Sequence, residues 1–420
     1  MMTLIEQTAF RGLLYCRGCK SQELFSIFNF GNLPIANELW EKSDESRFTF
    51  PLHLRLCQIC GLGQVQEVVN PSRLFQDYRY LSSVSLSFVE HARKFALETY
   101  NSLEIKENDW ILEIASNDGY LLQHYLDLGV DVLGVEPASN VAEQASAKGI
   151  PTINKFFGLQ TASELLNERG FPRLIIANNV MAHVPDLSDF LAGLSLLAGP
   201  ETLISIENPT MTNFLKGNQF DTIYHEHYSY LTAHSVDYIS KLNGLELFKV
   251  ENITTHGGSN RYWLRNSKIK HQLIQDSSVN STIRQEIQDG LLDEISWQKF
   301  SMEVSTTLKE FYKWLENSIT KGNRVVGYGA AAKASTLLNA SNIEKGWLKA
   351  IADESHEKIG RFMPIEGIPI VSPADLYLLQ PTDIVIFPWN IGEELIGKIK
   401  NDCPYPVRIW RAIPTIEQIA

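Results

Sequence analysis

The chain has 420 residues, 44% of them hydrophobic, and its formal net charge is −12. This length predicts about two to four domains, and the hydrophobic content argues against disorder along the whole chain. The acidity, without a basic tract, disfavours binding to nucleic acid or to an anionic membrane. No segment approaches the ~20 apolar residues of a membrane span, and residues 1–17 lack a signal-peptide core. We therefore expect a cytoplasmic protein that is a monomer or a weak dimer.

Four of the five cysteines form two close pairs near the N-terminus. Cys16 and Cys19 make the first C-x2-C pair, and Cys57 and Cys60 make the second. Two such pairs are typical of a zinc ribbon, in which four thiolates form a tetrahedral shell. Because that shell leaves no open position, we predict a structural zinc ion. Disulfides or free thiols are the alternative, and disulfides are rare in cytosolic proteins.

After a stretch rich in Ser and Tyr that includes Tyr78, the sequence predicts a strand, a tight turn and a helix. The strand is Trp110–Ile114 and the helix is Tyr120–Leu128; the next strand, Asp131–Val135, is followed by Glu136. Small residues in the turn let the backbone approach a ligand, and a carboxylate about 20 positions later can bond ribose hydroxyls. The pattern predicts a nucleoside-binding unit.

The residues of this turn favour one nucleoside ligand over another. A dinucleotide fingerprint would have glycine where this chain has Ala115 and Asn117. Glu113, Asp118 and Gly119 are closer to the loop of class I methyltransferases, whose ligand S-adenosylmethionine has no pyrophosphate. We predict a cofactor site that consists of Glu113, Ala115, Ser116, Asn117, Asp118, Gly119, Glu136, Pro137, Asn178 and Asn179.

Three further predicted strands, at residues 150–157, 173–177 and 202–206, continue the alternating α/β pattern. Active sites of open α/β sheets lie beyond the carboxyl ends of the strands. His183 and Glu207 both follow such ends. From its position alone, His183 is either an acid–base group or a histidine that packs in a core or loop.

The segment Asp221–Tyr230 combines two histidines, three tyrosines, an Asp and a Glu. Loops rarely use so many aromatic residues, and core strands rarely use so many ionisable ones. The run His225, Glu226, His227 is compatible with a metal site, with proton transfer or with packing. The four cysteines are the better zinc site, which weakens the first of these interpretations.

The C-terminal part contains a second strand, turn and helix at residues 324–338, with Gly327, Gly329 and Lys333. The helix N-terminus and the lysine would suit a diphosphate, but one incomplete glycine pattern is weak evidence for NAD. Residues 266–318 predict surface helices that lead to this unit. Other candidate ligand residues lie in a glycine turn and at strand ends: Gly257, Gly258, Ser259, Arg261, Asp353 and Asn390.

Taken together, these motifs resemble the sugar C-methyltransferases of deoxysugar biosynthesis, which methylate C3 of a nucleotide-linked 4-keto-6-deoxyhexose. The resemblance spans nearly the whole chain. It is carried by the cysteine pairs and by Leu33–Asn37, Tyr78–Ser83, Glu113–Gly119, Ala177–Asp186, Asp221–His227, His256–Ser259, Gly327–Lys333 and Pro388–Asn390.

The resemblance implies three domains: a zinc-binding domain (1–80), a class I methyltransferase Rossmann-like domain (81–265) and a Rossmann-like α/β domain that helps to hold the sugar nucleotide (266–420). It implies the cofactors S-adenosylmethionine and structural Zn²⁺, and a sugar nucleotide as substrate. Substrate-binding residues would be His225, Gly257, Gly258, Ser259, Arg261, Gly329, Lys333, Asp353 and Asn390. Acid–base residues would be Tyr78, His183, Tyr224, Glu226 and His227.

The chemistry explains why acid–base residues are needed. A base must remove the C3 proton next to the ketone, and donors must stabilise the enolate oxygen. We predict His227 as the base, with His183 as its rival, and Tyr224 as the donor to the keto sugar. Glu226 would fix a histidine tautomer or contact the sugar. A regular strand would turn Tyr224 and Glu226 away from His227, so we expect an irregular loop that directs all three into a cleft between the central and C-terminal domains.

Two other functions stay open on the sequence alone. One is an NAD-dependent sugar-nucleotide oxidoreductase, suggested by the C-terminal glycines. The other is a non-catalytic zinc-knuckle scaffold with a degenerate methyltransferase domain. The resemblance favours thymidine diphosphate as the nucleotide, with guanosine diphosphate as the alternative.

Overall fold

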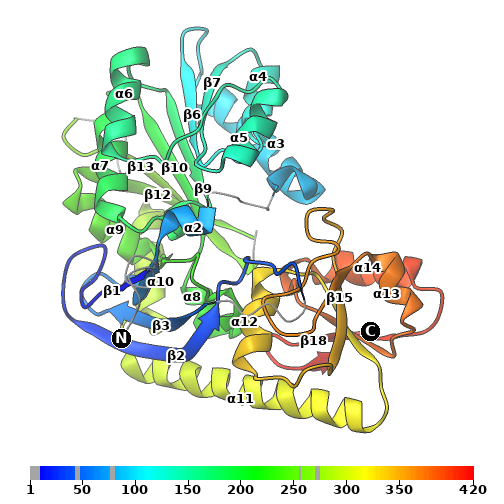
Figure 1. Cartoon of the computed structure of the whole chain (residues 1–420). Coiled ribbons are helices and arrows are strands. Elements are labelled where there is room, and N and C mark those ends of the chain that lie inside the picture. The colour runs from blue at the N-terminus through cyan, green and yellow to red at the C-terminus, as the bar shows by residue number, and fades with distance from the viewer. Residues whose placement is uncertain (1–9, 43–47, 76–80, 255–256, 270–274) are drawn as a thin grey trace.

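The structure is a computed structural model that describes residues 10–42, 48–75, 81–254, 257–269 and 275–420. A large central α/β unit lies above an N-terminal β unit and a C-terminal α/β unit (Figure 1). None of the helices in these ranges is long and apolar enough to cross a membrane.

The N-terminal unit is built on a sheet with the strand order β11-β4-β3-β2. The side chains of β3 alternate between buried and partly exposed, as in a sheet with one face on a core. A smaller sheet pairs β1 with β5, and the short helix α2 follows it. The bounds are β1 Phe10–Gly12, β2 Leu24–Pro34, β3 Thr49–Cys57, β4 Gly63–Val65, β5 Glu67–Val69, α2 Pro71–Phe75 and β11 Ser229–Tyr230.

The central sheet has the order β12-β13-β10-β9-β6-β7-β8, in which only β13 runs antiparallel to its neighbours. The chain order reverses between β6 and β9, which is where ligands bind in sheets of this kind. The predicted strands are present, although the third is much shorter than expected. The bounds are β6 Trp110–Ile114, β7 Asp131–Val135, β8 Thr152–Ile153, β9 Leu174–Asn178, β10 Leu203–Pro209, β12 Leu245–Ile253 and β13 Ser259–Asn266.

Helices cover both faces of the central sheet (Figure 1). One core lies between the sheet and α6, α7 and α9, and another lies between the sheet and α3, α4 and α5. These two cores explain why the strands are apolar runs instead of alternating ones. The bounds are α3 Leu86–Ser102, α4 Leu122–Asp127, α5 Ser139–Ala147, α6 Leu159–Arg169, α7 Leu187–Leu197, α8 Thr212–Gly217 and α9 Ala233–Leu242.

The C-terminal unit has the strand order β16-β15-β14-β17-β18-β19, parallel except for β19. This is the doubly wound arrangement predicted for the second strand–turn–helix. The bounds are β14 Val325–Tyr328, α12 Ala332–Ala340, β15 Leu348–Ala352, β16 Ile370–Val371, α13 Pro373–Leu378, β17 Asp383–Ile386, α14 Gly392–Asp402, β18 Arg408–Arg411 and β19 Glu417–Gln418.

Two helices connect the central and C-terminal units. The first, α10 (Ser277–Gln288), packs on β12 and α9 of the central unit. The second, α11 (Glu294–Thr320), contacts β2, α8 and β14 and lies beneath both lower units (Figure 1). The predicted surface helices therefore bury an apolar stripe against other units. We propose that the C-terminal unit begins with α11, later than the predicted boundary at residue 266.

Candidate active site

The loop between η3 (Phe220–Thr222) and β11 is irregular, as expected, and it orders two predicted acid–base residues. The Nδ1 atom of His227 lies 2.9 Å from the carbonyl oxygen of Thr222, and its Nε2 atom lies 2.9 Å from the hydroxyl of Tyr224. A carbonyl only accepts, so Nδ1 carries the proton and Nε2 accepts from Tyr224. The loop thus fixes the tautomer of His227.

His183 faces this pair from the carboxyl end of β9, in the short helix η2 (Met181–His183). Its ring lies 4.8 Å from the ring of His227. Its Nδ1 atom donates to the carbonyl oxygen of Glu226 at 2.8 Å. Burial lowers the pKa of His183 to about 4, although this bond opposes the shift. The imidazole is therefore neutral at pH 7, and its Nε2 atom bonds to none of the residues that the structure describes.

Two neighbours in the loop bond to the N-terminal unit. The buried carboxylate of Glu226 accepts from the backbone and side-chain nitrogens of Asn37, both at 3.0 Å. His225 is buried, and its Nε2 atom donates to the carbonyls of Phe50 and Pro51. The expectation that Glu226 turns into the cleft is therefore wrong, because the N-terminal unit supplies its partner. The backbone of Glu226, not its carboxylate, orients His183.

The C-terminal unit meets this loop through a cluster of polar groups. The indole nitrogen of Trp389, in η5 (Trp389–Ile391), donates to Asp221 at 2.8 Å. Lys333 bonds to Asn390 at 2.7 Å and lies 4.1 Å from the centre of the Trp389 ring. Burial raises the pKa of Asp221 to about 6, against the effects of Lys333 and Trp389. Burial also lowers the pKa of Lys333. This cluster makes the junction of the two units polar.

The glycine turn at Gly257 and Gly258 lies at the same junction, against Trp389. Gly257 and Gly258 have φ angles of +84° and +109°, and a Cβ atom on Gly257 would lie 2.6 Å from the Trp389 ring. The side chain of Asn213 donates to both of their carbonyls. The turn thus requires glycine for its backbone and for its close approach to Trp389. Tyr78 lies outside the described residues.

Two residues predicted to bind substrate nearby have other partners. Arg261 is buried in β13, where its guanidinium bonds to Glu207 at 2.9 Å and to Glu251 at 3.2 Å. Its charge is therefore balanced within the central unit. Ser259 is also buried, in the same strand. Neither position suits a diphosphate, so we leave both out of the proposed substrate site, together with His225.

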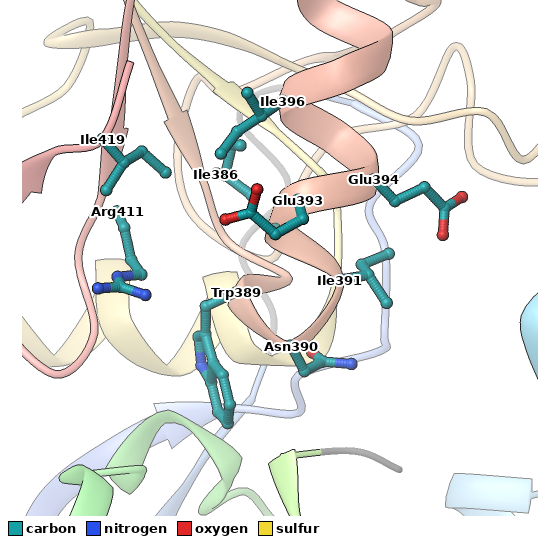
Figure 2. Close-up of a pocket in the computed structure, with 10 residues that line it drawn as sticks. Ile386, Trp389, Asn390, Ile391, Glu393, Glu394, Ile396, Arg411 and Ile419 are labelled. Carbon is teal, nitrogen blue, oxygen red and sulfur yellow. The ribbon is translucent and has the colours of Figure 1, made fainter. Parts of the chain in front are cut away.

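A pocket of about 240 Å³ lies beside Trp389, beyond β17 and at the start of α14. Figure 2 shows the Trp389 ring extending away from α14, with Glu393 on that helix and Arg411 on β18. The walls combine apolar side chains with charged and polar ones. They comprise Ile386, Trp389, Asn390, Ile391, Gly392, Glu393, Glu394, Ile396, Arg411 and Ile419.

The predicted cofactor loop lies between β6 and α4, at the point where the sheet order reverses. Ala115, Asn117 and Gly119 all have positive φ angles, so the turn is tight despite its incomplete glycines. Glu136, at the end of β7, accepts from the backbone nitrogens of Asn117 and Ala138 at 3.0 and 2.9 Å. Its pKa is raised to about 7 by burial, against these two bonds. Glu136 therefore shapes the loop.

Several polar atoms around this loop are buried without partners in the described part of the chain. They are Oε2 of Glu113, Oδ1 of Asn178 and both amide atoms of Asn208. Burial, with the nearby charges of Glu136 and Asp118, raises the pKa of Glu113 well above its usual value. Groups left unpaired in this way fit a ligand with amino and hydroxyl groups, such as S-adenosylmethionine. Asn208 is absent from the predicted set, although it directly follows Glu207 at a strand end.

The remaining predicted cofactor residues have structural roles or positions at the same edge. Asp118 pairs with Lys148 at 2.7 Å and accepts from Ser83. Ser116 is buried, and Asn179 has a positive φ and donates to the carbonyl of Glu207. Pro137 follows Glu136, and its carbonyl accepts from Asn154. Hydrogen bonds thus link the loop after β6 and the carboxyl ends of the neighbouring strands along one edge of the sheet.

The corresponding loop of the C-terminal unit is closed by its own residues. The backbone nitrogen of Ala330 donates to Asp353 at 2.9 Å, and Lys358 bonds to both of these residues. A Cβ atom on Gly329 would lie 2.3 Å from Pro388. A dinucleotide pyrophosphate binds to free N–H groups of such a loop. Here the Ala330 N–H is occupied, which argues against the NAD-dependent alternative and against ligand binding by Asp353.

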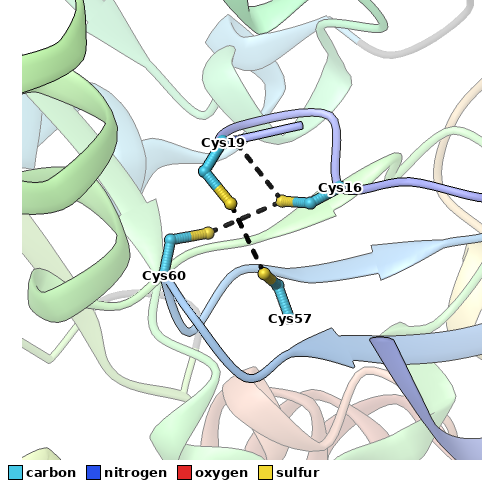
Figure 3. Close-up of side chains that lie close together, drawn as sticks. All are labelled: Cys16, Cys19, Cys57 and Cys60. Atoms are coloured by element: carbon cyan, nitrogen blue, oxygen red, sulfur yellow. Dashed lines mark hydrogen bonds between the residues drawn. The ribbon is translucent and has the colours of Figure 1, made fainter. Parts of the chain in front are cut away.

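The four paired cysteines gather at the edge of the N-terminal unit (Figure 3). Their sulfur atoms all lie within 4.8 Å of one another, and two pairs are 3.5 Å apart. Four Zn–S bonds of ~2.3 Å in a tetrahedron place the sulfurs ~3.8 Å apart. The site fits zinc as it stands. Cys403 is not part of this cluster.

The zinc site is also connected to the loop that contains Tyr224 and His227. Buried Arg17, within the first cysteine pair, donates to the carbonyl of Val65 at 2.9 Å and to the Ser229 hydroxyl at 3.2 Å. β11, which follows the loop, pairs with β4. The second cysteine pair therefore lies a few residues from a strand that contacts the end of the loop.

Comparisons with known proteins agree with this architecture. Residues 16–75 match a domain described as "Putative zinc binding domain", residues 88–250 match a methyltransferase domain, and residues 254–408 match a C-methyltransferase C-terminal domain. The C-methyltransferase NovU from Streptomyces niveus is 30% identical over 388 residues, which cover 92% of each chain.

Two solved structures illustrate the similarity of part of the chain to known folds. Magnesium protoporphyrin IX methyltransferase from Synechocystis is 13% identical, covers 43% of this chain and 79% of its own, and has a TM-score of 0.31. The PH0226 protein from Pyrococcus horikoshii is 12% identical, covers 46% and 97%, and has a TM-score of 0.35. Nothing about the substrate follows from such similarity.

The relative that matches along nearly the whole chain is decisive for the class of protein. Because that relative is a C-methyltransferase, both alternative functions, the oxidoreductase and the non-catalytic scaffold, are rejected. The chain is an S-adenosylmethionine-dependent C-methyltransferase with a zinc-binding domain, and it belongs to the sugar C-methyltransferase family.

Proposed function

We propose that the protein methylates C3 of a 4-keto-6-deoxy sugar linked to a nucleotide diphosphate, with thymidine diphosphate as the nucleotide. The main support is the position of the His183–His227 pair, whose rings lie 4.8 Å apart. His183 follows β9 at the cofactor edge of the central sheet, and the His227 loop contacts the C-terminal unit through Asp221. A sugar at this junction would lie between a methyl donor on one side and Lys333 on the other.

The first step of the proposed reaction is proton transfer from C3 to His227. In the structure, Nε2 of His227 accepts from the hydroxyl of Tyr224. We propose that Tyr224 turns its hydrogen bond to the C4 oxygen of the bound sugar, which frees Nε2 for the C3 proton. The same donor would stabilise the enolate as charge develops on that oxygen. Breaking the bond between Tyr224 and His227 would thus free Tyr224 to donate to the C4 oxygen and His227 to accept the C3 proton.

The second step forms the carbon–carbon bond. S-adenosylmethionine supplies a methyl group that is already activated by its sulfonium charge. The enolate carbon bonds to this methyl as the carbon–sulfur bond breaks, and the ketone re-forms at C4. The chain's contribution is to hold the two reactants in line and to exclude water. Glu113, Asn178 and Asn208 are the groups that we propose to orient the donor.

The neutral imidazole of His183 makes it the competing candidate for the base. Its Nε2 atom bonds to no described residue, whereas that of His227 is occupied by Tyr224. We propose that His183 orients the donor methyl or the sugar instead, because Tyr224 can act together with His227. Lys333 and Asn390 would bind the diphosphate. The pocket beside Trp389 is a candidate for part of the nucleotide.

The test is incubation of the protein with S-adenosylmethionine and a panel of 4-keto-6-deoxy sugar nucleotides in deuterated water. We expect a mass gain of one methyl group, and deuterium at C3 when the donor is omitted. The panel should include thymidine and guanosine diphosphate sugars. Methylation at oxygen, or no C3 exchange with any sugar, would refute the proposal.

Three variants separate the two histidines. His227→Gln should slow both C3 exchange and methyl transfer by ~10²–10⁴-fold, the range for a general base. His183→Asn should leave exchange faster than methyl transfer. His53→Gln is the control, because His53 lies on β3 and bonds to Ser26 at 2.7 Å. Near-normal exchange in His227→Gln together with its loss in His183→Asn would reverse the two assignments.

A further inference from the structure

Trp389 has more contacts with the catalytic machinery than a wall of a pocket requires. Its indole nitrogen donates to Oδ2 of Asp221 at 2.8 Å. Its ring lies against Gly257, where a Cβ atom would come within 2.6 Å, and carries the Lys333 ammonium 4.1 Å from its centre. A single side chain of the C-terminal unit therefore contacts the η3 segment, the glycine turn and the predicted phosphate-binding lysine.

The contact with Asp221 leads directly to the tautomer of His227. Asp221 precedes Thr222, whose carbonyl oxygen accepts from Nδ1 of His227 at 2.9 Å. On the other side, the carbonyl of Ile223 accepts from the Thr336 hydroxyl at 3.0 Å. The C-terminal unit thus holds the residues immediately before and after Thr222. Within the turn, the Thr222 hydroxyl also donates to the carbonyl of Gln219 at 2.7 Å.

The carboxylate of Asp221 is suited to such a role. The residue is 2% exposed, and its second oxygen, Oδ1, has no partner among the described residues. A buried carboxylate with few partners is costly unless the partners it has are well placed. Loss of the Trp389 donor would leave the charge opposed only by Lys333 and by local backbone groups. We expect the segment to move toward solvent or toward Lys333 in that case.

We propose that Trp389 is a positioning residue for methyl transfer, which acts through Asp221 to hold the Thr222 carbonyl against His227 and so keeps Nε2 of His227 as the proton acceptor. The proposal rests on the proposed function of His227 as the base. It means that the C-terminal unit contributes to the chemical step as well as to binding.

The test compares two tryptophan variants that remove the same kind of hydrogen bond. Trp389→Phe removes the donor to Asp221 but keeps an aromatic ring beside Gly257 and Lys333. Trp410→Phe is the matched control, because Trp410 donates to Asp383 at 2.7 Å within the C-terminal unit. A misplacement of ~1 Å can cost ~10²-fold in rate, so we expect a ~10–100-fold lower kcat for Trp389→Phe. Trp410→Phe should stay within twofold.

The pattern of kinetic changes distinguishes positioning from binding. In Trp389→Phe, C3 deuterium exchange should fall together with kcat, whereas KM for the sugar nucleotide and the affinity for S-adenosylmethionine should change less than threefold. Equal rates in the two tryptophan variants, or a change in KM alone, would overturn the proposal. A wild-type protein that exchanges no C3 proton with any sugar would instead refute the proposed function.

A double-mutant cycle tests the route through Asp221. Asp221→Ala, which removes the acceptor, should alone reduce kcat by a factor similar to that for Trp389→Phe. If both act through one hydrogen bond, the double variant should lose little more than either single variant. Multiplication of the two effects would show that Trp389 acts independently of Asp221 and would overturn the proposal.

Discussion

The central and C-terminal units both contain a strand, a tight turn and a helix at the point where the sheet order reverses, but the two turns are used differently. In the central unit, Glu136 shapes the turn while Glu113, Asn178 and Asn208 keep polar atoms without partners in the described chain. In the C-terminal unit, Asp353 and Lys358 occupy the corresponding turn. Similar topology therefore does not imply a similar ligand; the unpaired groups at the strand ends indicate which unit binds one.

The largest expected effect concerns the contribution of Glu207, at the carboxyl end of β10 in the central sheet, to the stability of the fold. Burial alone would raise the pKa of Glu207, but His91 and Arg261 outweigh it and lower the pKa to about 2. Because the folded pKa lies below the unfolded one, this stabilisation is complete above about pH 4.5 and is lost as the pH falls toward 2. Glu207→Gln should cost ~3 kcal/mol at pH 7 and less than half of that at pH 3.

Urea unfolding of both proteins at pH 7 and pH 3 measures this difference. Glu251→Gln is the control, since Glu251 shares the Arg261 partner but is partly exposed. The interpretation fails if Glu207→Gln is equally destabilising at both pH values.

The next effect compares the two turns directly. Glu136→Gln removes a carboxylate oxygen that accepts a backbone N–H of the central turn, and Asp353→Asn makes the same change in the C-terminal turn. Loss of hydrogen bonds to a charged group costs ~1.5–3 kcal/mol. In calorimetry at about pH 8.5, above the pKa of Glu136, we expect Glu136→Gln to weaken S-adenosylmethionine binding by ~30-fold, at ~2 kcal/mol for the lost bond. Asp353→Asn should change it less than threefold, and equal losses would mean that the turns are not distinct.

A smaller effect concerns how the C-terminal unit binds substrate. Lys333→Met keeps a side chain of similar length but removes the ammonium beside Trp389. KM for the sugar nucleotide should rise ~10-fold or more, at ~1.5 kcal/mol for one hydrogen bond to a charged group. Binding of S-adenosylmethionine should not change. Lys398→Met, which removes a surface pair with Glu354, is the matched control. A change in S-adenosylmethionine affinity with Lys333→Met would place the lysine at the other ligand.

The smallest expected effect is that of NAD on the thermal stability of the protein. At a hundred times its dissociation constant, S-adenosylmethionine should stabilise the protein by ~2.7 kcal/mol. NAD should not shift the thermal unfolding midpoint, because Asp353 occupies the Ala330 N–H of the second turn. A stabilisation by NAD that Asp353→Asn abolishes would show that the second turn does bind a dinucleotide.

The elements that the sequence predicts well are those determined by local pattern. The strands Trp110–Ile114 and Asp131–Val135 have the predicted bounds, because apolar runs between turn residues specify buried parallel strands. The cysteine pairs likewise identify their site through spacing alone. The irregular loop around Tyr224 is instead predicted from the roles that the family resemblance implies for Tyr224, Glu226 and His227.

The direction of polar side chains is the part that local sequence does not determine. Glu226 turns to Asn37, which is 189 positions away, and Asp221 turns to Trp389, which is 168 positions away. Arg261 is neutralised by Glu207 from a neighbouring strand. Such partners are brought together only by the arrangement of the three units, so Asn208 and Trp389 could not be assigned roles from spacing.

The connection between the zinc site and the loop that contains His227 has a practical consequence for assays. Arg17 bridges the first cysteine pair to Ser229, two residues after His227, and β4 pairs with the strand that contains Ser229. Four thiolates leave the metal no position for a substrate. A chelator would nevertheless abolish turnover by loosening the end of the loop. Inhibition by chelation would therefore report a loss of loop order in this enzyme, and it should not be taken as evidence for metal-assisted chemistry.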